Sequence, residues 1–144
     1  MSVKINQADL KKLNKKVAML KQFSKQGLAN EVGKTAMEIV GRAKKSAPID
    51  TGNLRQGISS EASGKGVAVL SEAAYSPYVE FGTGGMVDLN DMLELGIPSG
   101  YAAQFKGKGL REVNLPARPF FFSSARVGFN NMLKRIEKQL KRMT

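Results

Sequence analysis

The chain has 144 residues, a hydrophobic content of 42% and a formal net charge of +11. This length and apolar content favour one folded domain with a modest core and exclude a wholly disordered chain. Cysteine and histidine are both absent, which excludes thiol chemistry, removes the commonest metal ligand and general base, and fits a reducing compartment.

The charge is unevenly distributed along the chain. Residues 1–45 carry 11 basic and 3 acidic side chains, residues 46–125 carry 6 and 8, and residues 126–144 carry 6 and 1. Basic ends around a slightly acidic centre suggest an anionic partner, either nucleic acid or an acidic protein surface. No signal peptide is evident, and no apolar run approaches the roughly 18 residues that a membrane span needs.

The first 47 residues predict helix. Asn6 is suited to cap its start, and a break is expected at residues 24–27. Because the residue before Pro48 disfavours the helical region, the helix should end by Ala47. An apolar stripe runs at three- and four-residue steps on both sides of the break: Leu10, Leu13, Val17, Leu20, Leu28, Val32, Ala36, Ile39 and Ala43.

Strand patterns follow the turn at residues 48–53. Residues 54–62 and 67–71 predict two strands joined by a hairpin loop at 63–66, with Val67, Val69 and Ser71 on one face. Residues 78–81 predict a short third strand, and 113–115 a fourth. Between these two lies a long segment, 86–112, with a short helix expected at 86–95 and loop at 96–109.

The C-terminal helix is the clearest predicted element, with Pro119 at its first position. Its apolar stripe comprises Phe122, Ala125, Phe129, Met132, Leu133, Ile136, Leu140 and Met143. The predicted fold is therefore an α+β single domain over 1–144. It has a long N-terminal helix, a small antiparallel sheet of three to four strands, a C-terminal amphipathic helix packed on the sheet, and an insertion loop at about 86–112.

Two glycine-containing segments invite a phosphate-binding interpretation. Gly33-Lys34-Thr35 resembles the end of a P-loop, but Leu28 stands where that motif needs glycine, and the segment lies within a helical pattern. Residues 81–85 could bind an anion through backbone N–H groups, yet glycines at a sharp turn leaving a strand explain them better.

The carboxylates do not converge by spacing. Folding could assemble an acid–base pair or a metal site from Asp50, Glu80, Asp88, Asp91 and Glu94, but surface positions explain the last three more simply. Glu80 alternates between apolar neighbours, so we predict that it faces solvent or forms a structural ion pair at a subunit boundary, with Arg55 or Arg118 as its partner.

Three segments, in this order, carry a family resemblance: Ala47-Pro48-Ile49-Asp50-Thr51-Gly52-Asn53-Leu54-Arg55, Tyr75-Ser76-Pro77-Tyr78-Val79-Glu80-Phe81-Gly82-Thr83-Gly84 and Ala117-Arg118-Pro119-Phe120-Phe121. Together they resemble the head–tail joining or tail-completion (neck, minor tail) family of lambdoid-type long-tailed bacteriophages. The resemblance spans roughly residues 30–140, and the segment 86–112 is the part without a counterpart.

The resemblance implies a structural virion protein of the neck or upper tail. Such a protein forms a ring, expected to be a hexamer, that completes the tail and joins it to the head. Its partners would be further copies and neighbouring neck and tail proteins, in the virion and, during assembly, in the host cytoplasm. The resemblance implies no enzymatic activity, cofactor, metal or membrane. It marks as scaffold or interface Asp50, Thr51, Gly52, Tyr75, Tyr78, Glu80, Phe81, Gly82, Arg118, Pro119 and Phe120.

Two other functions remain open on the residues alone. The basic helices could contact genomic DNA without sequence preference in the portal or neck channel, with Lys134, Lys138 and Lys141 as candidate contacts. A lysine-rich face is, however, usually just solvated. A small hydrolase that uses aspartate, glutamate and a metal is the remaining alternative, and no acid–base constellation can be named for it.

Overall fold

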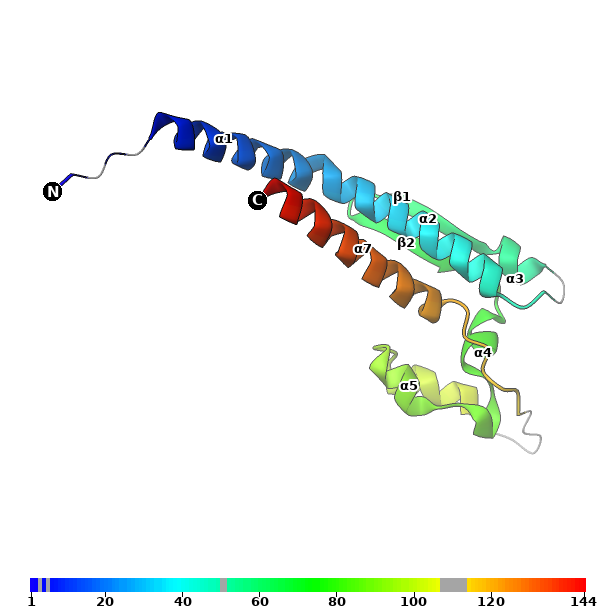
Figure 1. The fold of residues 1–144 in the computed structure, drawn as a ribbon. Coiled ribbons are helices and arrows are strands. Elements are labelled where there is room, and N and C mark those ends of the chain that lie inside the picture. Colours follow the sequence, from blue (N-terminus) through cyan, green and yellow to red (C-terminus); the bar gives the residue numbers. More distant parts are fainter. Residues whose placement is uncertain (3, 5, 50–51, 107–113) are drawn as a thin grey trace.

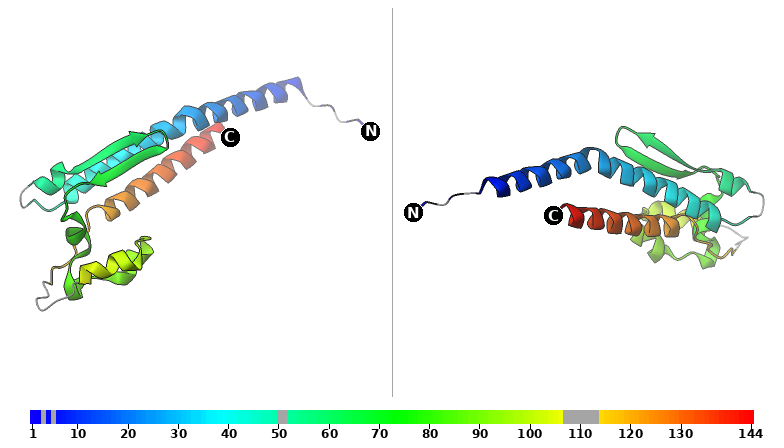
Figure 2. Two further views of the ribbon diagram at one scale, coloured as in Figure 1. Left: turned by 180° about the vertical axis from the view of Figure 1, so that it is seen from behind. Right: turned by 45° about the horizontal axis from the view of Figure 1, so that its top comes forward.

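The computed structural model describes the whole chain except residues 3, 5, 50–51 and 107–113. Two long helical segments dominate it, and helix α2 lies between a β-hairpin on one side and helix α7 on the other (Figures 1 and 2). A lobe of short helices, which includes α5, lies at the end of α7 where that helix begins. The N-terminal helix α1 extends past the opposite end of the molecule.

The N-terminal segment is a nearly continuous rod of α1 (Gln7–Gln22), the π-helical turn η1 (Phe23–Gly27) and α2 (Leu28–Ser46). The Asn6 side chain accepts a hydrogen bond from the Ala8 N–H at 3.0 Å, which confirms the predicted cap. The break expected at 24–27 is the π turn. A Cβ on Gly27 would collide with the buried ring of Phe23, so this ring can fold over the turn only beside glycine.

The hairpin consists of β1 (Ile58–Ser63) and β2 (Gly66–Ser71), which pair in an antiparallel register from Ile58↔Ser71 to Ser63↔Gly66. The predicted hairpin is confirmed, with its loop shortened to residues 64–65 because Ser63 and Gly66 pair with each other. The predicted start of the first strand is wrong, because residues 53–56 form the helical turn α3 (Asn53–Gln56). Gly52 takes a left-handed conformation (φ 77°), and its carbonyl accepts from the Gln56 N–H at 3.0 Å.

The predicted third strand is a helix, α4 (Ser76–Phe81). Pro77 fits the first turn of a helix, and the Tyr75 carbonyl accepts from the N–H groups of Tyr78 and Val79. The buried residues Ser76 and Glu80 stand four apart on one helical face. Six residues are too few for periodicity to separate a helix from a strand, which explains the wrong assignment.

The predicted fourth strand is not formed by its described part. Residue 113 lies outside the described residues, and Asn114 and Leu115 have no regular structure. Leu115 instead exchanges hydrogen bonds with Thr83, whose N–H donates to the Leu115 carbonyl at 3.0 Å and whose hydroxyl accepts from the Leu115 N–H at 3.0 Å. Within the described residues the sheet therefore has two strands instead of three or four.

The predicted long loop contains a small helical lobe. It comprises η2 (Gly84–Met86), α5 (Leu89–Glu94), α6 (Ser99–Ala103) and η3 (Gln104–Lys106). The lobe has its own buried cluster of Val87, Met92, Ala102 and Phe105. The short helix expected at 86–95 is confirmed as α5. The loop expected at 96–109 is wrong for residues 99–106, where Ala102 and Phe105 turn inward, and its last part, 107–109, lies outside the described residues.

Helix α7 (Phe122–Met143) packs along α2, not on the sheet as predicted. The two helices approach closely at Gly128, where a Cβ would collide with the side chain of Ile39. The mixed helix-and-sheet fold class is thus confirmed, whereas the strand number and the packing of the last helix differ from the prediction.

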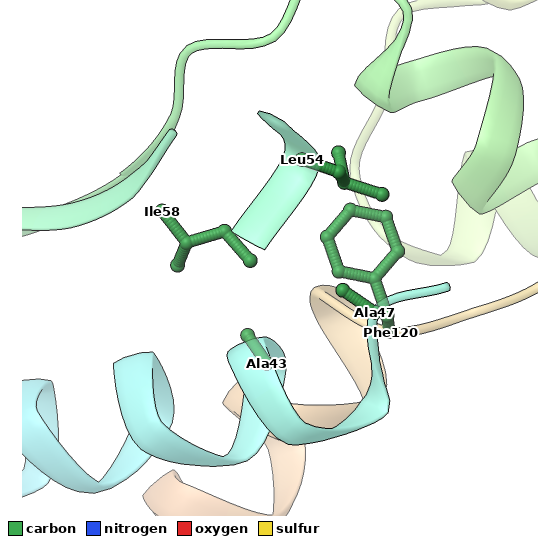
Figure 3. Close-up of a cluster of buried hydrophobic side chains, with 5 residues drawn as sticks. All are labelled: Ala43, Ala47, Leu54, Ile58 and Phe120. Atoms are coloured by element: carbon green, nitrogen blue, oxygen red, sulfur yellow. The ribbon is translucent and has the colours of Figure 1, made fainter. Parts of the chain in front are cut away.

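The main core joins the ends of these elements. Ala43 and Ala47 of the α2 end, Leu54 of α3, Ile58 of β1 and Phe120 lie together in one buried cluster (Figure 3). Phe120 is fully buried and stands just before α7, so this cluster fixes where α7 begins relative to α2 and the hairpin.

Candidate assembly surfaces

The three motif segments meet at one corner of the molecule, where Phe120 packs with Ala47 and Leu54 and where Glu80 binds the start of α7. Its carboxylate accepts the backbone N–H groups of Phe120 at 2.7 Å, Phe121 at 2.9 Å and Phe122 at 3.0 Å. The first N–H groups of a helix have no partner within it, and the positive end of the helix dipole favours an anion. Glu80 of α4 therefore caps α7 from 40 residues away in the sequence.

The predicted role of Glu80 as a surface or ion-paired residue is wrong. The residue is buried, with 5% of its surface exposed, and its oxygens are occupied by backbone donors. Arg55 instead donates to the Ala47 carbonyl, through Nε and Nη2 at 3.3 Å each. The Arg118 backbone N–H donates to the Val79 carbonyl at 2.8 Å. Pro119 is not the first residue of α7, because the chain turns into the helix only at Phe122.

The remaining motif residues support the same corner. Gly82 has a positive φ of 76°, and a Cβ there would collide with the backbone at Leu115 and Ala117. Phe81 and Tyr78 pack against Phe105 of the lobe, and their ring centroids lie 5.8 and 5.1 Å, respectively, from that of Phe105. Tyr75 and Tyr78 remain half exposed beside a hollow of about 330 Å³. Asp50 and Thr51 lie outside the described residues.

The other candidate chemical sites are dispersed. Asp88 caps α5 by accepting from the N–H groups of Asn90 at 2.9 Å and Asp91 at 3.3 Å, whereas Glu94 is exposed at the end of this helix. Among the described residues no group of three or more acidic side chains is placed to hold a metal ion. Residues 33–35 lie inside α2, so the loop that a P-loop needs is replaced by helix.

Helices α2 and α7 meet through a polar seam. Arg135 donates to Glu31 at 2.7 Å, to Glu38 at 3.1 Å and to the Thr35 hydroxyl at 2.9 Å. Two amide side chains complete the seam. Gln139 donates to Glu31 at 2.7 Å, and Asn131 donates to Glu38 at 2.6 Å. Glu31 is 2% exposed, so its charge depends on these partners, and such geometry fixes the register of two helices.

This seam lowers the pKa of both glutamates. The hydrogen bond from Arg135 is the main reason why the pKa of Glu31 lies below its ordinary value of 4.5, against the opposing effect of burial. For Glu38, the hydrogen bond from Asn131 has the largest effect in lowering the pKa, and Arg135 and Arg42 add to it. Both carboxylates are therefore charged at neutral pH.

Helix α7 packs its polar side against α2. Its apolar side therefore remains partly exposed and lines an open groove. This groove, of about 300 Å³, lies between α7 and β2, and α2 forms its floor. Its lining has no charged side chain: Val32, Thr35, Ala36, Ile39, Val67, Val69, Phe121, Phe122, Ala125, Phe129 and Met132. Phe129 at the rim is 52% exposed. The predicted common face of Val67 and Val69 is confirmed, since both line the groove.

Comparison with known families decides the chain's identity. Residues 9–82 match the HK97-gp10-like family, described as "Bacteriophage HK97-gp10, putative tail-component". The chain belongs to this family. A search of curated proteins found no match. A search of solved structures likewise found none.

The HK97-gp10-like match covers the rod, the hairpin and α4, and it ends at Gly82. Family membership supports a structural protein of a bacteriophage tail, and so a place in the virion. The predicted resemblance is confirmed at this level. The segment with Arg118, Pro119 and Phe120 lies beyond the match, but its contacts with Val79 and Glu80 tie it to the matched part.

The basic surface of this HK97-gp10-like chain is concentrated where α1 and the end of α7 meet. The Lys16 ammonium donates to the Thr144 carbonyl at 2.6 Å, and Lys12, Lys15 and Arg142 line the same hollow. Lys134 and Lys138 are exposed farther along α7. Lys141 forms an exposed ion pair with Glu137 at 2.8 Å, which raises the pKa of Lys141.

Sequence reasoning missed the residues that organise these surfaces. Neither Arg135 nor Glu31 stands out within the amphipathic patterns of the two helices. A signal was present, because Glu31, Thr35 and Glu38 share a helical face at steps of four and three.

None of the described helices is long and apolar enough to cross a bilayer.

Proposed function

We propose that this protein is a ring-forming component of the neck or upper tail that completes the tail and joins it to the head. Its membership in a bacteriophage tail-component family supports the structural role. The head-joining role rests on the resemblance of the three motif segments, which the structure gathers into a scaffold corner built of backbone contacts. In this proposal the protein acts by assembly and catalyses no reaction.

The observation that carries the assembly role is the extent of apolar surface left open by the described chain. The groove is uncovered, and α1 buries none of its residues, although Leu13 and Val17 are 56% and 41% exposed along one stripe. Soluble monomers rarely leave contiguous apolar patches of this kind uncovered, whereas subunits of an assembly cover them with neighbours. A ring multiplies each weak contact through effective concentration, and about six copies would follow the tail's symmetry.

Deletion of the gene from the phage tests this role. We expect heads and tails to accumulate separately, or tails to have malformed ends. Supplying the protein in trans should restore complete particles. Electron microscopy of complete particles should place the protein as a ring at the head–tail junction. Normal infectious particles after deletion would contradict the proposal, and so would a location elsewhere in the virion.

A second candidate function is contact with the genome, and the basic hollow between α1 and α7 favours it. Lys12, Lys15, Lys16 and Arg142 gather there, and Lys134 and Lys138 extend the positive surface along α7. Such a surface would neutralise phosphates without reading sequence, so duplex binding should weaken steeply as salt rises. Reversal of charge at Lys12, Lys15 and Lys138 should abolish this binding, and unchanged binding would remove this candidate.

A further inference from the structure

The groove and helix α1 are two uncovered apolar surfaces of one chain. On α1, Leu13, Val17 and Leu20 stand at i, i+4 and i+7, which is the spacing of anchors by which a helix docks into a groove. They are 56%, 41% and 37% exposed, and α1 has no buried residue. The lysines of α1 lie mainly on its other faces, so the stripe can be covered while the charges stay in water.

The groove has matching chemistry and length. Its lining is uncharged, and its α7 wall runs from Phe122 to Met132. At 1.5 Å per residue this wall is about 15 Å long, whereas Leu13 to Leu20 span about 10 Å. An apolar helix stripe of three anchors therefore fits within the wall, and Phe129 at the rim would lose exposed surface on docking.

A chain cannot place α1 in its own groove. The π turn η1 continues α1 into α2, and α2 is the floor of the groove, so α1 points away from it along the rod (Figures 1 and 2). We propose that α1 of a second copy of this chain occupies the groove between β2 and α7. This inference rests on the ring proposed above, because the helix and the groove are different surfaces and their contact is head-to-tail.

Charge supports a second copy over an acidic partner. With a net charge of +11, copies repel one another over most of their surfaces, and the groove offers a contact without charge in its lining. An acidic partner would find no cationic side chain in this lining with which to pair. Since screening removes repulsion between like-charged copies, association through the groove should strengthen as salt rises. Binding of DNA to the basic end would show the opposite dependence.

The absence of cysteine permits a direct test by disulfide trapping. Full-length Val17→Cys and Phe129→Cys proteins are mixed, oxidised and analysed on non-reducing gels. We expect a cross-linked dimer in the mixture and little in either protein alone. The matched control is Lys15→Cys, on the opposite face of α1, mixed with Phe129→Cys, which should give at least tenfold less dimer.

A second variant keeps the test independent of trapping. Because α1 buries no residue, Val17→Asp should leave the circular dichroism and melting of the subunit unchanged while weakening self-association more than tenfold in sedimentation or native mass measurements. Lys15→Asp is the matched control and should not weaken association. Self-association that is unchanged by Val17→Asp would overturn the inference, as would a disulfide dimer that forms only between two copies of the Val17→Cys protein.

The two proposals fail in different ways. A protein that occupies the head–tail junction in microscopy but shows no 17–129 cross-link in particles retains the proposed function and loses this inference. A strong 17–129 cross-link in a protein that is absent from particles supports this inference and contradicts the proposed function. A wild-type chain that stays monomeric at all concentrations and salt levels overturns the inference, with another tail protein then the occupant of the groove.

Discussion

The corner around Phe120 and the groove along α7 differ in how far the single chain satisfies its own groups. At the corner, Phe120 is fully buried, Glu80 accepts three backbone N–H groups, and the described buried side-chain polar atoms all have partners. In the groove, apolar side chains such as Phe129 remain exposed. The motif segments thus satisfy one another's groups at the corner, whereas the groove, to which they contribute only Phe121, leaves apolar side chains exposed.

The largest expected effect is the difference in subunit stability between variants of the buried Phe120 and the exposed Phe129. Phe120→Ala removes a fully buried ring and should lower the free energy of unfolding by about 4 kcal/mol, measured by urea denaturation of the subunit. Phe129→Ala removes a ring that is 52% exposed, so subunit stability should change by less than about 1 kcal/mol while self-association weakens. Equal losses of stability would show that the groove is part of the core.

Glu80→Ala tests the corner through its polar contacts. It leaves three N–H groups at a buried helix start without their acceptor and should cost about 3 kcal/mol in urea denaturation. Glu80→Gln keeps one acceptor oxygen and should lose about half as much. The exposed Glu94, which no helix start uses, is the matched control, and Glu94→Ala should be nearly neutral. A Glu80→Ala protein as stable as this control would remove the capping role.

Helix packing beside the groove should show a smaller effect. Gly128→Ala places a methyl group against Ile39 and should push α7 away from α2 at a cost of about 2 kcal/mol. Gly41→Ala is the control within the partner helix, because nothing lies within 4 Å of its Cβ position. Since alanine favours helix over glycine, this control should gain about 0.5 kcal/mol. Two variants of equal melting temperature would contradict the close approach at Gly128.

The smallest effect concerns pH. Because the folded pKa values of Glu31 and Glu38 are lowered, their contribution is complete above the ordinary value of 4.5 and is lost as pH falls through the folded values. Unfolding measured by urea should therefore show declining stability below about pH 4.5. Glu31→Gln should be less stable at pH 7 and show a shallower decline. A decline as steep as in the wild type would place the acid sensitivity outside the seam.

Long, strongly periodic elements could be predicted from the sequence. The rod, its cap at Asn6 and its end before Pro48 depend on local preferences of neighbouring residues, and so do the hairpin loop and α7. Short elements could not. The segment Ser76–Phe81 alternates like a strand over too few residues, and only its contact with the start of α7 shows why Glu80 must turn inward.

Residues close together in the chain, or a pattern of motifs, were enough to identify the rod, the hairpin, the final amphipathic helix, the asymmetry of charge and the bacteriophage family. Which side of α7 is buried depends instead on tertiary contacts. Hydrophobicity alone assigns the apolar side to the core. The ion pairs of Glu31 and Glu38 with Arg135 and the close approach at Gly128 instead seat the polar side on α2. Such contacts join residues about 100 positions apart, so they leave no local trace in the sequence, and they leave the apolar side of α7 facing the open groove.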